Sequence, residues 1–597
     1  MSTADSPVIM LSGRKFVLAC AIVACGLAVI GRIRPLPVSL VAAEVFITIL
    51  SLFVFGSFKY QIHKNALTYG MVLVIVSTFL GLESTAWHQQ VAADGWWPWL
   101  REHVLSFHGL DELIHADTML FILGLTFFVA VIAQTRILEG VTFFLLRRNS
   151  GAILPTVIAV TAVVAFSSGI LDGVSMIGLT IRTLVIILML AAAPKRAVLR
   201  AVMICTTVTT ICGVWLAYGE PPNLIMKANL DPHLGGTFFL RYCGPIALVA
   251  YFVVARHLRK DLEGRRINLD TMDVIDANAE DVRFLQASRH GEVLTPVELV
   301  EFHAQDLEGK APQIIERVQQ GTSLGRALVD ANLPWETREL LLGHYVSEEL
   351  ATSLDRHYVL DSMGDDEGAM RAEQWVDDTL AASAQARRRA QLYGALALIP
   401  FAGLLVVHGF NHEVPLFLAS FAGFGAAMFG ISKIPKMRDL ALHEGRQEYA
   451  EYYFLFPLFL SITLLTQAGF FDDMAALIRH GVDTLGHGAV AWAQFAGATF
   501  LSAILDNNIV ADFASRALEN FDLQLLHLFA MAQIAGYALG GCWTHIGSAQ
   551  SVVAYSFIQR DVDAGYTPIQ WIREMTPVIL EMFALITIVI AIESWLL

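Results

Sequence analysis

Long apolar segments separated by short polar ones run through most of the chain. Hydrophobic residues fill 55% of the 597 positions and charged residues only 16%, whereas a soluble protein carries about 25% charged residues. Many apolar runs reach the roughly 20 residues that a helix needs to cross a bilayer. The pattern predicts an all-α polytopic membrane protein with about 11 transmembrane helices, some of which are broken. The predicted spans are 16–30, 38–56, 66–86, 118–137, 152–193, 201–229, 239–255, 391–407, 414–432, 453–470, 487–518, 523–558 and 575–597.

One long stretch is too polar to cross a bilayer. Residues 257–390 carry acidic and basic residues at helical spacing, and a structureless loop of this length is unusual. The stretch therefore predicts a small helical domain, with either a packing or a regulatory role. It divides the chain into an N-terminal membrane half at 1–256, this insert, and a C-terminal membrane half at 391–597.

The positions of Lys and Arg predict the orientation in the membrane. Arg256, Arg259 and the run Arg387–Arg389 flank the insert, and positive charges near spans favour the cytoplasmic side. Counting back, the N-terminus is also cytoplasmic. The first apolar run follows basic residues, as in a signal peptide, but lacks a small-x-small cleavage site, which favours an uncleaved helix. We expect a multi-pass protein of a bacterial inner membrane.

Two aspartates occupy matching positions within the apolar tracts. Residues 165–175 read AFSSGILDGVS and residues 498–508 read ATFLSAILDNN, so Asp172 corresponds to Asp506, 334 residues later. Further matches, such as Gly219 with Gly547, follow in the same order at nearly the same offset. They predict two duplicated halves. The halves are predicted to be inverted, because the span at 118 starts outside and its partner at 453 starts inside, as in many secondary transporters.

Each half also contains a second interruption, YGEPPN at 218–223 and THIGSAQ at 544–550. The two prolines of the first remove backbone donors and stop a helix. Irregular backbone at membrane depth is tolerated only where it is buried in protein or lines a cavity. The four breaks therefore indicate a binding site. Whether tracts 152–193 and 487–518 form hairpins or two full spans each stays open, although small residues at the first break favour a hairpin.

The stretches LSAILDNN, GILDGVS and YGEPPNLI resemble the ion transporter superfamily, especially NhaD-type sodium/proton antiporters, with arsenite-pump and citrate-transporter-like relatives. The resemblance covers residues 38–256 and 391–597. It implies two re-entrant hairpins, alternating access by an elevator-like movement, and a homodimer. Carried over by position, the implied site residues are Ser168, Asp172, Gly173, Ser175, Gly219, Glu220, Pro221, Asn223, Ser502, Asp506, Asn507, Asn508, Gly547, Ser548 and Gln550. The chain departs from the family pattern at Gly173, which replaces an asparagine, and at Glu220, which replaces a small residue.

Asp172 and Asp506 are the principal candidates for binding an ion, because an acid at membrane depth is functional by default. Carboxylate oxygens suit a hard cation such as Na⁺, and a buried carboxylate lets protons and Na⁺ compete for one group. The alternative role is helix capping, for which Asp is well suited. The full candidate set for ion or substrate binding is Asp172, Ser175, Glu220, Asn223, Asp506, Asn507, Asn508, Ser548 and Gln550. His545 is either a proton relay or a buried histidine with a structural role. Asp512 and Glu581 are further candidates.

The sequence thus predicts a secondary active transporter, most simply a Na⁺/H⁺ antiporter that uses the buried aspartates in alternating access. Its expected partners are the lipid bilayer, a small inorganic ion and a second copy of the chain, and no nucleic acid. A Na⁺- or H⁺-coupled transporter of a carboxylate or oxyanion is the alternative. The absence of a clearly buried Lys or Arg at either tip favours a cation. A channel or membrane sensor is a third possibility. We expect neither an enzyme nor a cofactor other than the transported ions, since no nucleophile–base pair, nucleotide loop or metal cluster is evident.

Overall fold

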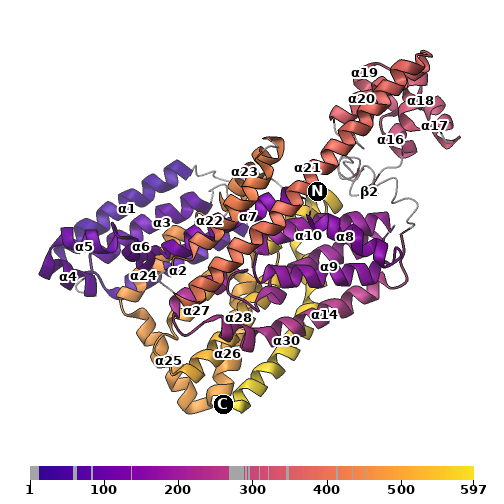
Figure 1. The fold of residues 1–597 in the computed structure, drawn as a ribbon. Coiled ribbons are helices and arrows are strands. Elements are labelled where there is room, and N and C mark those ends of the chain that lie inside the picture. Colours follow the sequence, from indigo (N-terminus) through magenta and orange to yellow (C-terminus); the bar gives the residue numbers. More distant parts are fainter. Residues whose placement is uncertain are drawn as a thin grey trace, which may run out of the picture.

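The computed structural model describes most of the chain. The described residues are 13–57, 64–82, 85–135, 137–171, 173–191, 193–267, 288–289, 292–293, 296–307, 309–320, 322–343, 348–411, 414–432, 435–450 and 452–597. Within them the fold is helical (Figure 1), apart from a two-stranded antiparallel ribbon of β1 (Ser288–Arg289) and β2 (Glu292–Val293). Asp172 lies outside the described residues.

Helices are present in every predicted span, which confirms an all-α membrane protein. Among the described residues, eight helices are long and apolar enough to cross a membrane. They are Gly13–Ile33, Ala116–Gln134, Lys195–Gly213, Gly236–Leu262, Arg388–His408, Met437–Gln467, Leu523–Trp543 and Pro568–Leu596. Five shorter apolar helices accompany them: Val38–Leu52, Asn65–Leu80, Ile153–Ser168, Met176–Val185 and Phe417–Ile431.

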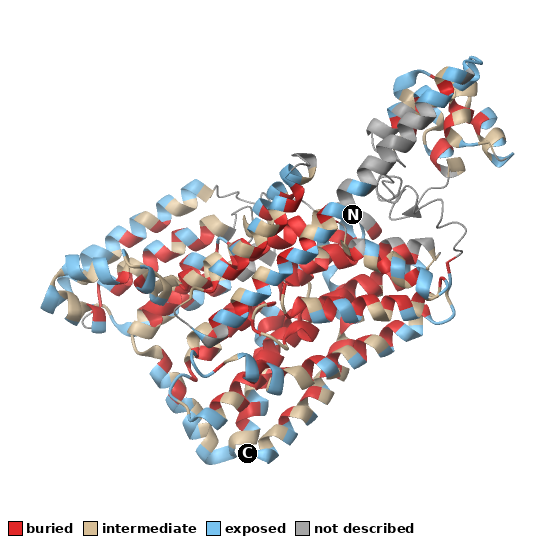
Figure 2. Cartoon of the chain, viewed as in Figure 1, coloured by how far each residue is buried: buried red, intermediate tan, exposed pale blue. Residues whose placement is uncertain are grey.

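Burial separates a central pair of helices from the periphery (Figure 2). The apolar windows of α11 (Lys195–Thr209) and α28 (Leu523–Trp543) are each 89% buried, whereas only 11% of that of α1 (Gly13–Ile33) is buried. A helix surrounded by other helices is apolar on all sides, while a helix at the protein surface within a membrane keeps its apolar residues exposed. The core of the membrane part is therefore built around α11 and α28, and α1 presents Leu18, Ile22 and Ile33 outward.

The first group of helices lies at one end of the membrane part in Figure 1. It comprises α1 and α2 (Val38–Ser57), which both pack on α3 (Lys64–Leu80), and α24 (Leu455–Gln467), which also packs on α3. Three short helices that the hydropathy pattern did not predict follow: α4 (Ala86–Asp94), α5 (Trp96–His103) and α6 (Phe107–Ile114). They are too short to cross a bilayer, so a search for long apolar runs passes over them.

A second group consists of α7 (Ala116–Gln134), α21 (Asp366–Phe410), α22 (Phe417–Ile431) and α23 (Pro435–Ala450). The Asp117 carboxylate fixes α7 to the start of α22, because it accepts hydrogen bonds from the backbone N–H groups of Leu416 (2.8 Å) and Phe417 (2.9 Å). Side-chain acceptors at this position satisfy donors that the first helical turn leaves free. Helix α21 has 45 residues and is therefore about 68 Å long, long enough to run from the insert into the membrane part.

The remaining helices repeat one order in each half of the chain. In the first half, α8 (Ile137–Arg148) precedes α9 (Ile153–Ser168), a break, α10 (Gly173–Leu190), α11, a second break that includes η1 (Ile211–Gly213), and α12 (Pro221–Asn229). Helix α13 (Gly236–Phe238), η2 (Phe239–Cys243) and α14 (Gly244–Leu262) follow.

In the second half, α25 (Phe470–Leu485) precedes α26 (His487–Ile504), a break, α27 (Asn507–Arg516), α28, a second break and α29 (Ala549–Phe557). The half ends with η4 (Ile558–Val562) and α30 (Pro568–Leu596). The four breaks lie where the sequence predicts them. Helix α27 has 10 residues and rises only about 15 Å, so it does not cross the hydrocarbon core by itself, and the tract at 487–518 is not two full spans.

The insert forms its own helical cluster, visible at the upper right of Figure 1. Its helices are α16 (Pro296–Phe302), η3 (Ala304–Leu307), α17 (Ala311–Gln319), α18 (Leu324–Asp330), α19 (Trp335–Leu342) and α20 (Glu348–Ser362), together with the first part of α21. A separate apolar core holds them together, including Leu299, Leu307, Ile314, Leu328 and Leu341, each fully buried. Helix α21 continues through residue 390 without interruption, so the insert is joined to the membrane part by a continuous helix.

A buried ion pair fixes two helices of the insert. The Arg338 guanidinium donates to both Asp355 carboxylate oxygens (2.6 and 2.8 Å) and to the Leu333 carbonyl (2.6 Å). Removing one partner of such a pair leaves an uncompensated charge, so we expect Asp355→Ala to destabilise the insert by about 3–5 kcal/mol. Hydrogen exchange of α19 and α20 in the full-length protein measures this.

The matched control is Arg371→Ala, which removes a pair with Glu367 whose side chains are 72% and 80% exposed. Exposed pairs contribute about 0–1 kcal/mol, so protection in the insert should stay at the wild-type level. Equal exchange in both variants would show that the Arg338–Asp355 pair does not stabilise the insert.

Candidate functional site

The two breaks of each half are bonded to each other by one backbone hydrogen bond. In the first half, the Gly173 N–H donates to the Gly219 carbonyl (2.9 Å), and in the second the Asn507 N–H donates to the Gly547 carbonyl (3.2 Å). The donor is in both cases the first residue of the helix after the acid-bearing break. The acceptor is the glycine of the second break. The two halves thus form the same backbone hydrogen bond at equivalent positions of their breaks.

Both glycines are required by close packing against the carbonyl of a buried serine. A Cβ atom built on Gly219 would lie 1.6 Å from the Ser168 carbonyl oxygen, and one built on Gly547 would lie 2.6 Å from the Ser502 carbonyl oxygen. Only glycine allows such an approach of backbone to backbone. Each serine in turn donates its hydroxyl to a carbonyl of the helix beside it, that of Val208 for Ser168 (3.4 Å) and that of Tyr537 for Ser502 (2.8 Å).

The break segments of one half pack against those of the other. Helix α12 lies on α27, and α29 lies on α10, so each pair joins a second-break helix of one half to a first-break helix of the other. Glu220 occupies the position just before α12 and is 1% exposed, and Gln550 of α29 is 2% exposed. The Gln550 Nε2 donates to both Glu220 carboxylate oxygens (3.0 Å each). This contact between the two second breaks places a buried carboxylate where the halves meet.

The glycine at position 173 and the acid at position 220 fit one another. A Cβ atom on Gly173 would lie 2.2 Å from Glu220 Oε1, 2.8 Å from Gln550 Nε2 and 3.1 Å from the Thr209 carbonyl oxygen. The Glu220 carboxylate therefore occupies the space that a side chain at position 173 would fill. Glycine at position 173 and glutamate at position 220 are therefore matched in size, since a larger residue at 173 would displace the Glu220 carboxylate.

Asp506 has the capping geometry that is the alternative to an ion-binding role. It is half-buried, precedes α27, and accepts hydrogen bonds at Oδ1 from the backbone N–H (2.9 Å) and side-chain Nδ2 (2.7 Å) of Asn508. Asn507 and Asn508 are 2% and 4% exposed. The Asn508 Oδ1 is buried without a hydrogen-bond partner among the described residues. The second tip thus places the Asn508 amide oxygen beside the Asp506 carboxylate.

The other predicted site residues differ in their contacts. Asn223 joins the two halves, because its Oδ1 accepts from the Tyr537 hydroxyl (2.6 Å) and its Nδ2 donates to the Leu216 carbonyl (3.2 Å). Ser548 caps α29 by accepting from the Ser551 N–H (3.2 Å). Ser175 lies on α10. His545 is half-buried and packs on the Tyr555 ring (4.7 Å between centroids).

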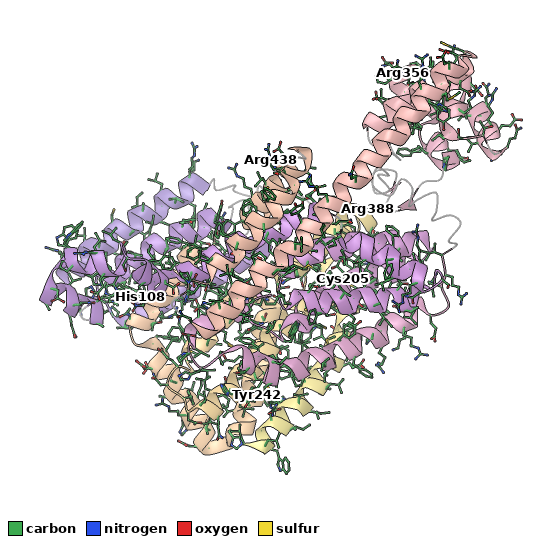
Figure 3. All side chains as sticks on the ribbon, viewed as in Figure 1. His108, Cys205, Tyr242, Arg356, Arg388 and Arg438 are labelled. Carbon is green, nitrogen blue, oxygen red and sulfur yellow. The ribbon has the colours of Figure 1, made fainter. Side chains whose placement is uncertain are left out.

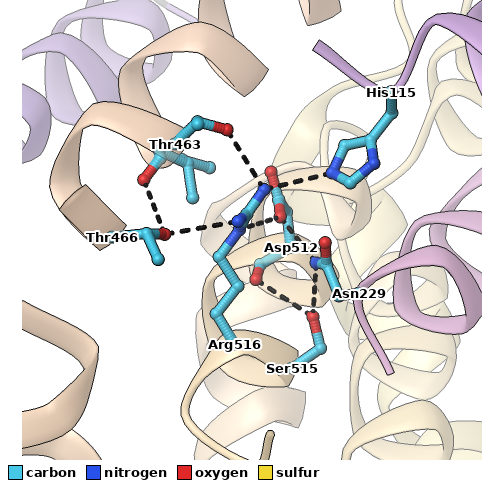
Figure 4. A network of polar contacts seen from close by, with 8 residues as sticks. His115, Asn229, Thr463, Thr466, Asp512, Ser515 and Arg516 are labelled. Atoms are coloured by element: carbon cyan, nitrogen blue, oxygen red, sulfur yellow. Dashed lines mark hydrogen bonds and ion pairs between the residues drawn. The ribbon is translucent and has the colours of Figure 1, made fainter. Parts of the chain in front are cut away.

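A second buried polar cluster, which we call the Arg516 network, lies beyond the breaks (Figure 4). It consists of His115, Asn229, Thr463, Thr466, Asp512, Ser515 and Arg516. Asp512 is fully buried and forms an ion pair with Arg516 (3.0 Å) on the same helix, α27. Sequence reasoning singled out Asp512 but missed Arg516, although their four-residue spacing places the two on one helix face. The contact with His115, about 400 positions away, has no signal in the sequence.

Two further ionisable groups are explained by the structure. Glu581 on α30 pairs with Arg256 (2.5 Å) and His257 (3.1 Å) on α14, so it joins these two helices. Lys227, which sequence reasoning also missed, is 8% exposed on α12, and its Nζ lies 3.5 Å from His408 Nε2 at the end of α21. Figure 3 shows the side chains of the described residues on the ribbon.

Comparison with known proteins adds no assignment. The chain matches no protein-family model and no curated protein. The geometry of the breaks, and above all the Glu220–Gln550 contact, therefore carries the functional argument.

Proposed function

We propose that the protein is a secondary active transporter that exchanges a small cation, most simply Na⁺, for protons. The observation that carries the proposal is the buried Glu220 carboxylate at the contact between the interrupted helices of the two halves. Ionisable residues inside a membrane protein are costly and mark ion or proton pathways. Interrupted helices at such a contact are where secondary transporters bind their ions.

The chemistry of the site suits a hard cation that competes with a proton. A carboxylate and side-chain amide oxygens are among the oxygen ligands that such cations prefer. A carboxylate binds either a proton or a metal cation, so one ligand leaves before the other enters. Exposure of the loaded site to alternate sides of the membrane then yields antiport. Asp506 contributes less in this proposal than the sequence suggests, because Oδ1 of its carboxylate caps α27.

We further propose that the two halves are an inverted repeat. The equivalent helices α14 and α30 run antiparallel, since Arg241 near the start of one pairs with Glu593 near the end of the other (2.6 Å). The exchanged packing of α12 on α27 and of α29 on α10 supports the same symmetry. Alternating access follows if these segments move against α7, α21 and α22. The proposal also includes a cytoplasmic location of the insert, a homodimer and a bacterial inner membrane. These parts rest on the charge pattern and the resemblance.

Proton movement in proteoliposomes that enclose a pH-sensitive dye tests the proposal. Adding Na⁺ or Li⁺ with an inert counter-anion should move protons. The same assay with K⁺ measures the selectivity among cations. We expect Asp172→Asn, Asp506→Asn and Glu220→Gln each to reduce the signal. No response to any cation, together with a response to one carboxylate or oxyanion, would replace the antiporter with the anion transporter.

That second candidate is favoured by one observation, the buried Lys227 on α12, the helix that follows Glu220. An ammonium group near a break can neutralise a carboxylate or oxyanion. Lys227→Met should then abolish transport of the anion. In the antiporter, the same variant should change cation-driven proton movement less than Glu220→Gln does, because Lys227 lies two helical turns beyond the carboxylate.

A further inference from the structure

One nitrogen atom holds both oxygens of the buried Glu220 carboxylate. Gln550 Nε2 lies 3.0 Å from Glu220 Oε1 and 3.0 Å from Glu220 Oε2. A group that faces both oxygens occupies the position at which a carboxylate binds a cation in a bidentate manner. The two side chains are 1% and 2% exposed, so the contact is shielded from bulk water. The Gln550 amide thus takes the place of a cation on Glu220 in this conformation.

The Gln550 amide can turn without losing hydrogen bonds to other residues. Within the part of the chain that the structure describes, its side-chain hydrogen bonds are the two to Glu220 and no others. A glutamine amide has two donors on its nitrogen and an acceptor on its oxygen. Rotation about χ3, which has a broad and roughly two-fold energy profile, exchanges the two ends without movement of the backbone. Gln550 Oε1 then faces the carboxylate in place of Nε2.

A backbone oxygen borders the same contact. A Cβ atom built on Gly173 would lie 2.2 Å from Glu220 Oε1 and 3.1 Å from the Thr209 carbonyl oxygen, so both oxygens approach one point beside Gly173. Thr209 is the last residue of α11. Carbonyls at this end of a helix have no partner within the helix and carry the negative end of its dipole. A cation on the Glu220 carboxylate would therefore lie next to a backbone oxygen suited to be a further ligand.

We propose that Gln550 is a switching ligand, whose amide turns as the Glu220 site exchanges a cation for a proton. When Glu220 is ionised and holds no cation, Gln550 Nε2 donates to both carboxylate oxygens, as in this conformation. When Na⁺ binds the carboxylate, the amide turns and Oε1 binds the cation beside the Thr209 carbonyl. When a proton from water binds instead, the protonated carboxyl donates to Oε1. The proposal rests on the proposed transport function and deepens it.

A neutral amide is the side-chain group that can serve all three forms of the carboxylate. Each form needs a partner, because a buried polar group without one is costly. The ionised carboxylate needs a donor, whereas bound Na⁺ and a protonated carboxyl need an acceptor. Lysine at position 550 would offer donors alone, and methionine would offer no donor and only a weak acceptor. Substitution by these two residues therefore separates the roles of the amide.

Infrared difference spectroscopy of the purified full-length protein, in NaCl minus choline chloride at constant pH, tests the proposal. Na⁺ should shift a carboxylate band that is absent in Glu220→Gln, and a side-chain amide C=O band that is absent in Gln550→Met. In Gln550→Met, the Na⁺ concentration that gives half of the carboxylate shift should rise by about 10-fold or more.

Gln559→Met is the matched control. It removes a glutamine whose Nε2 donates to the Tyr555 hydroxyl (2.8 Å) and the Tyr566 carbonyl (3.1 Å). Both Na⁺-induced shifts should persist in this variant at the wild-type Na⁺ concentration. An amide band that does not respond to Na⁺ in the wild type, or equal or tighter Na⁺ binding by Gln550→Met, would overturn the proposal.

Gln550→Lys provides a second measurement if Gln550→Met folds poorly. Its ammonium group pairs with the Glu220 carboxylate and leaves no buried charge unpaired, but it has no acceptor for a cation. The Na⁺-induced carboxylate shift should therefore disappear, and its persistence would contradict the switching role. Failure of the transport proposal has a different sign. It would appear as no carboxylate shift and no cation-driven proton movement in the wild-type protein, and would overturn both proposals.

Discussion

Glu220→Gln should reduce Na⁺-driven proton movement by about 100-fold or more, equivalent to at least about 2.8 kcal/mol at ten-fold per 1.4 kcal/mol. The substitution keeps the size of the side chain and removes its ability to ionise. Because the carboxylate is 1% exposed and accepts two hydrogen bonds from Gln550 Nε2, the change acts at the meeting point of the two halves. Initial rates in proteoliposomes of equal protein content measure the effect.

Glu263→Gln is the matched control for this loss. Glu263 lies just beyond α14 and pairs with Arg259 (3.0 Å) at the surface, where ion pairs contribute little. Its transport rate should therefore equal that of the wild type. Normal transport by Glu220→Gln, alongside inactive Asp506→Asn, would instead return the principal role to the aspartates of the first breaks. Asp506→Asn keeps an oxygen that can cap α27, so we expect it to fold.

Gly219→Ala should destabilise the protein by about 3 kcal/mol or more, at the upper end of what overpacking costs. The added Cβ would overlap the Ser168 carbonyl oxygen at 1.6 Å, and neither atom belongs to a flexible side chain. Relief requires separating the two breaks of the first half. The separation would also lengthen the hydrogen bond from Gly173 to Gly219. The apparent unfolding temperature of the detergent-solubilised protein, followed by transport assays, measures both consequences.

Alanine substitutions at two other glycines provide a comparison for the stability loss of Gly219→Ala. Gly547→Ala places its Cβ 2.6 Å from the Ser502 carbonyl oxygen and should cost less than Gly219→Ala. Gly497→Ala lies in the middle of α26 with open space around its Cβ, so the greater helix propensity of alanine should leave stability unchanged or raise it by up to about 1 kcal/mol. If Gly219→Ala unfolds at the same temperature as Gly497→Ala, the breaks are not packed as closely as the structure shows.

Hydrophobic pattern alone predicted the helical membrane class and the position of each break. This is because bilayer thickness fixes the length of an apolar run, and because Gly and Pro interrupt helices through their own backbone properties. It also located the polar insert. The hydrophobic pattern did not predict α4, α5 and α6, because these short helices lie outside the long apolar runs.

The residues of the candidate site could be predicted only in part from the sequence. Local sequence identified Glu220, Asn223 and Gln550 as candidates, because each lies at a break. It gave Asp506 and Asp172 priority over Glu220, since the repeated S-x-I-L-D pattern is the more conspicuous feature. Asp506 has the geometry of a helix cap, and Asp172 stays a prediction.

Tertiary packing decided which of these candidate residues lie in contact with one another. Glu220 meets Gln550 across 330 positions, and His115 meets Arg516 across 401. Such contacts depend on how α12, α27 and α29 cross, which no local periodicity specifies. Sequence determined which segments break within the membrane, because that depends on the chemistry of single residues. Only the folded structure decided which acid is buried between the halves and which is held by an arginine, because burial and pairing are properties of surfaces brought together.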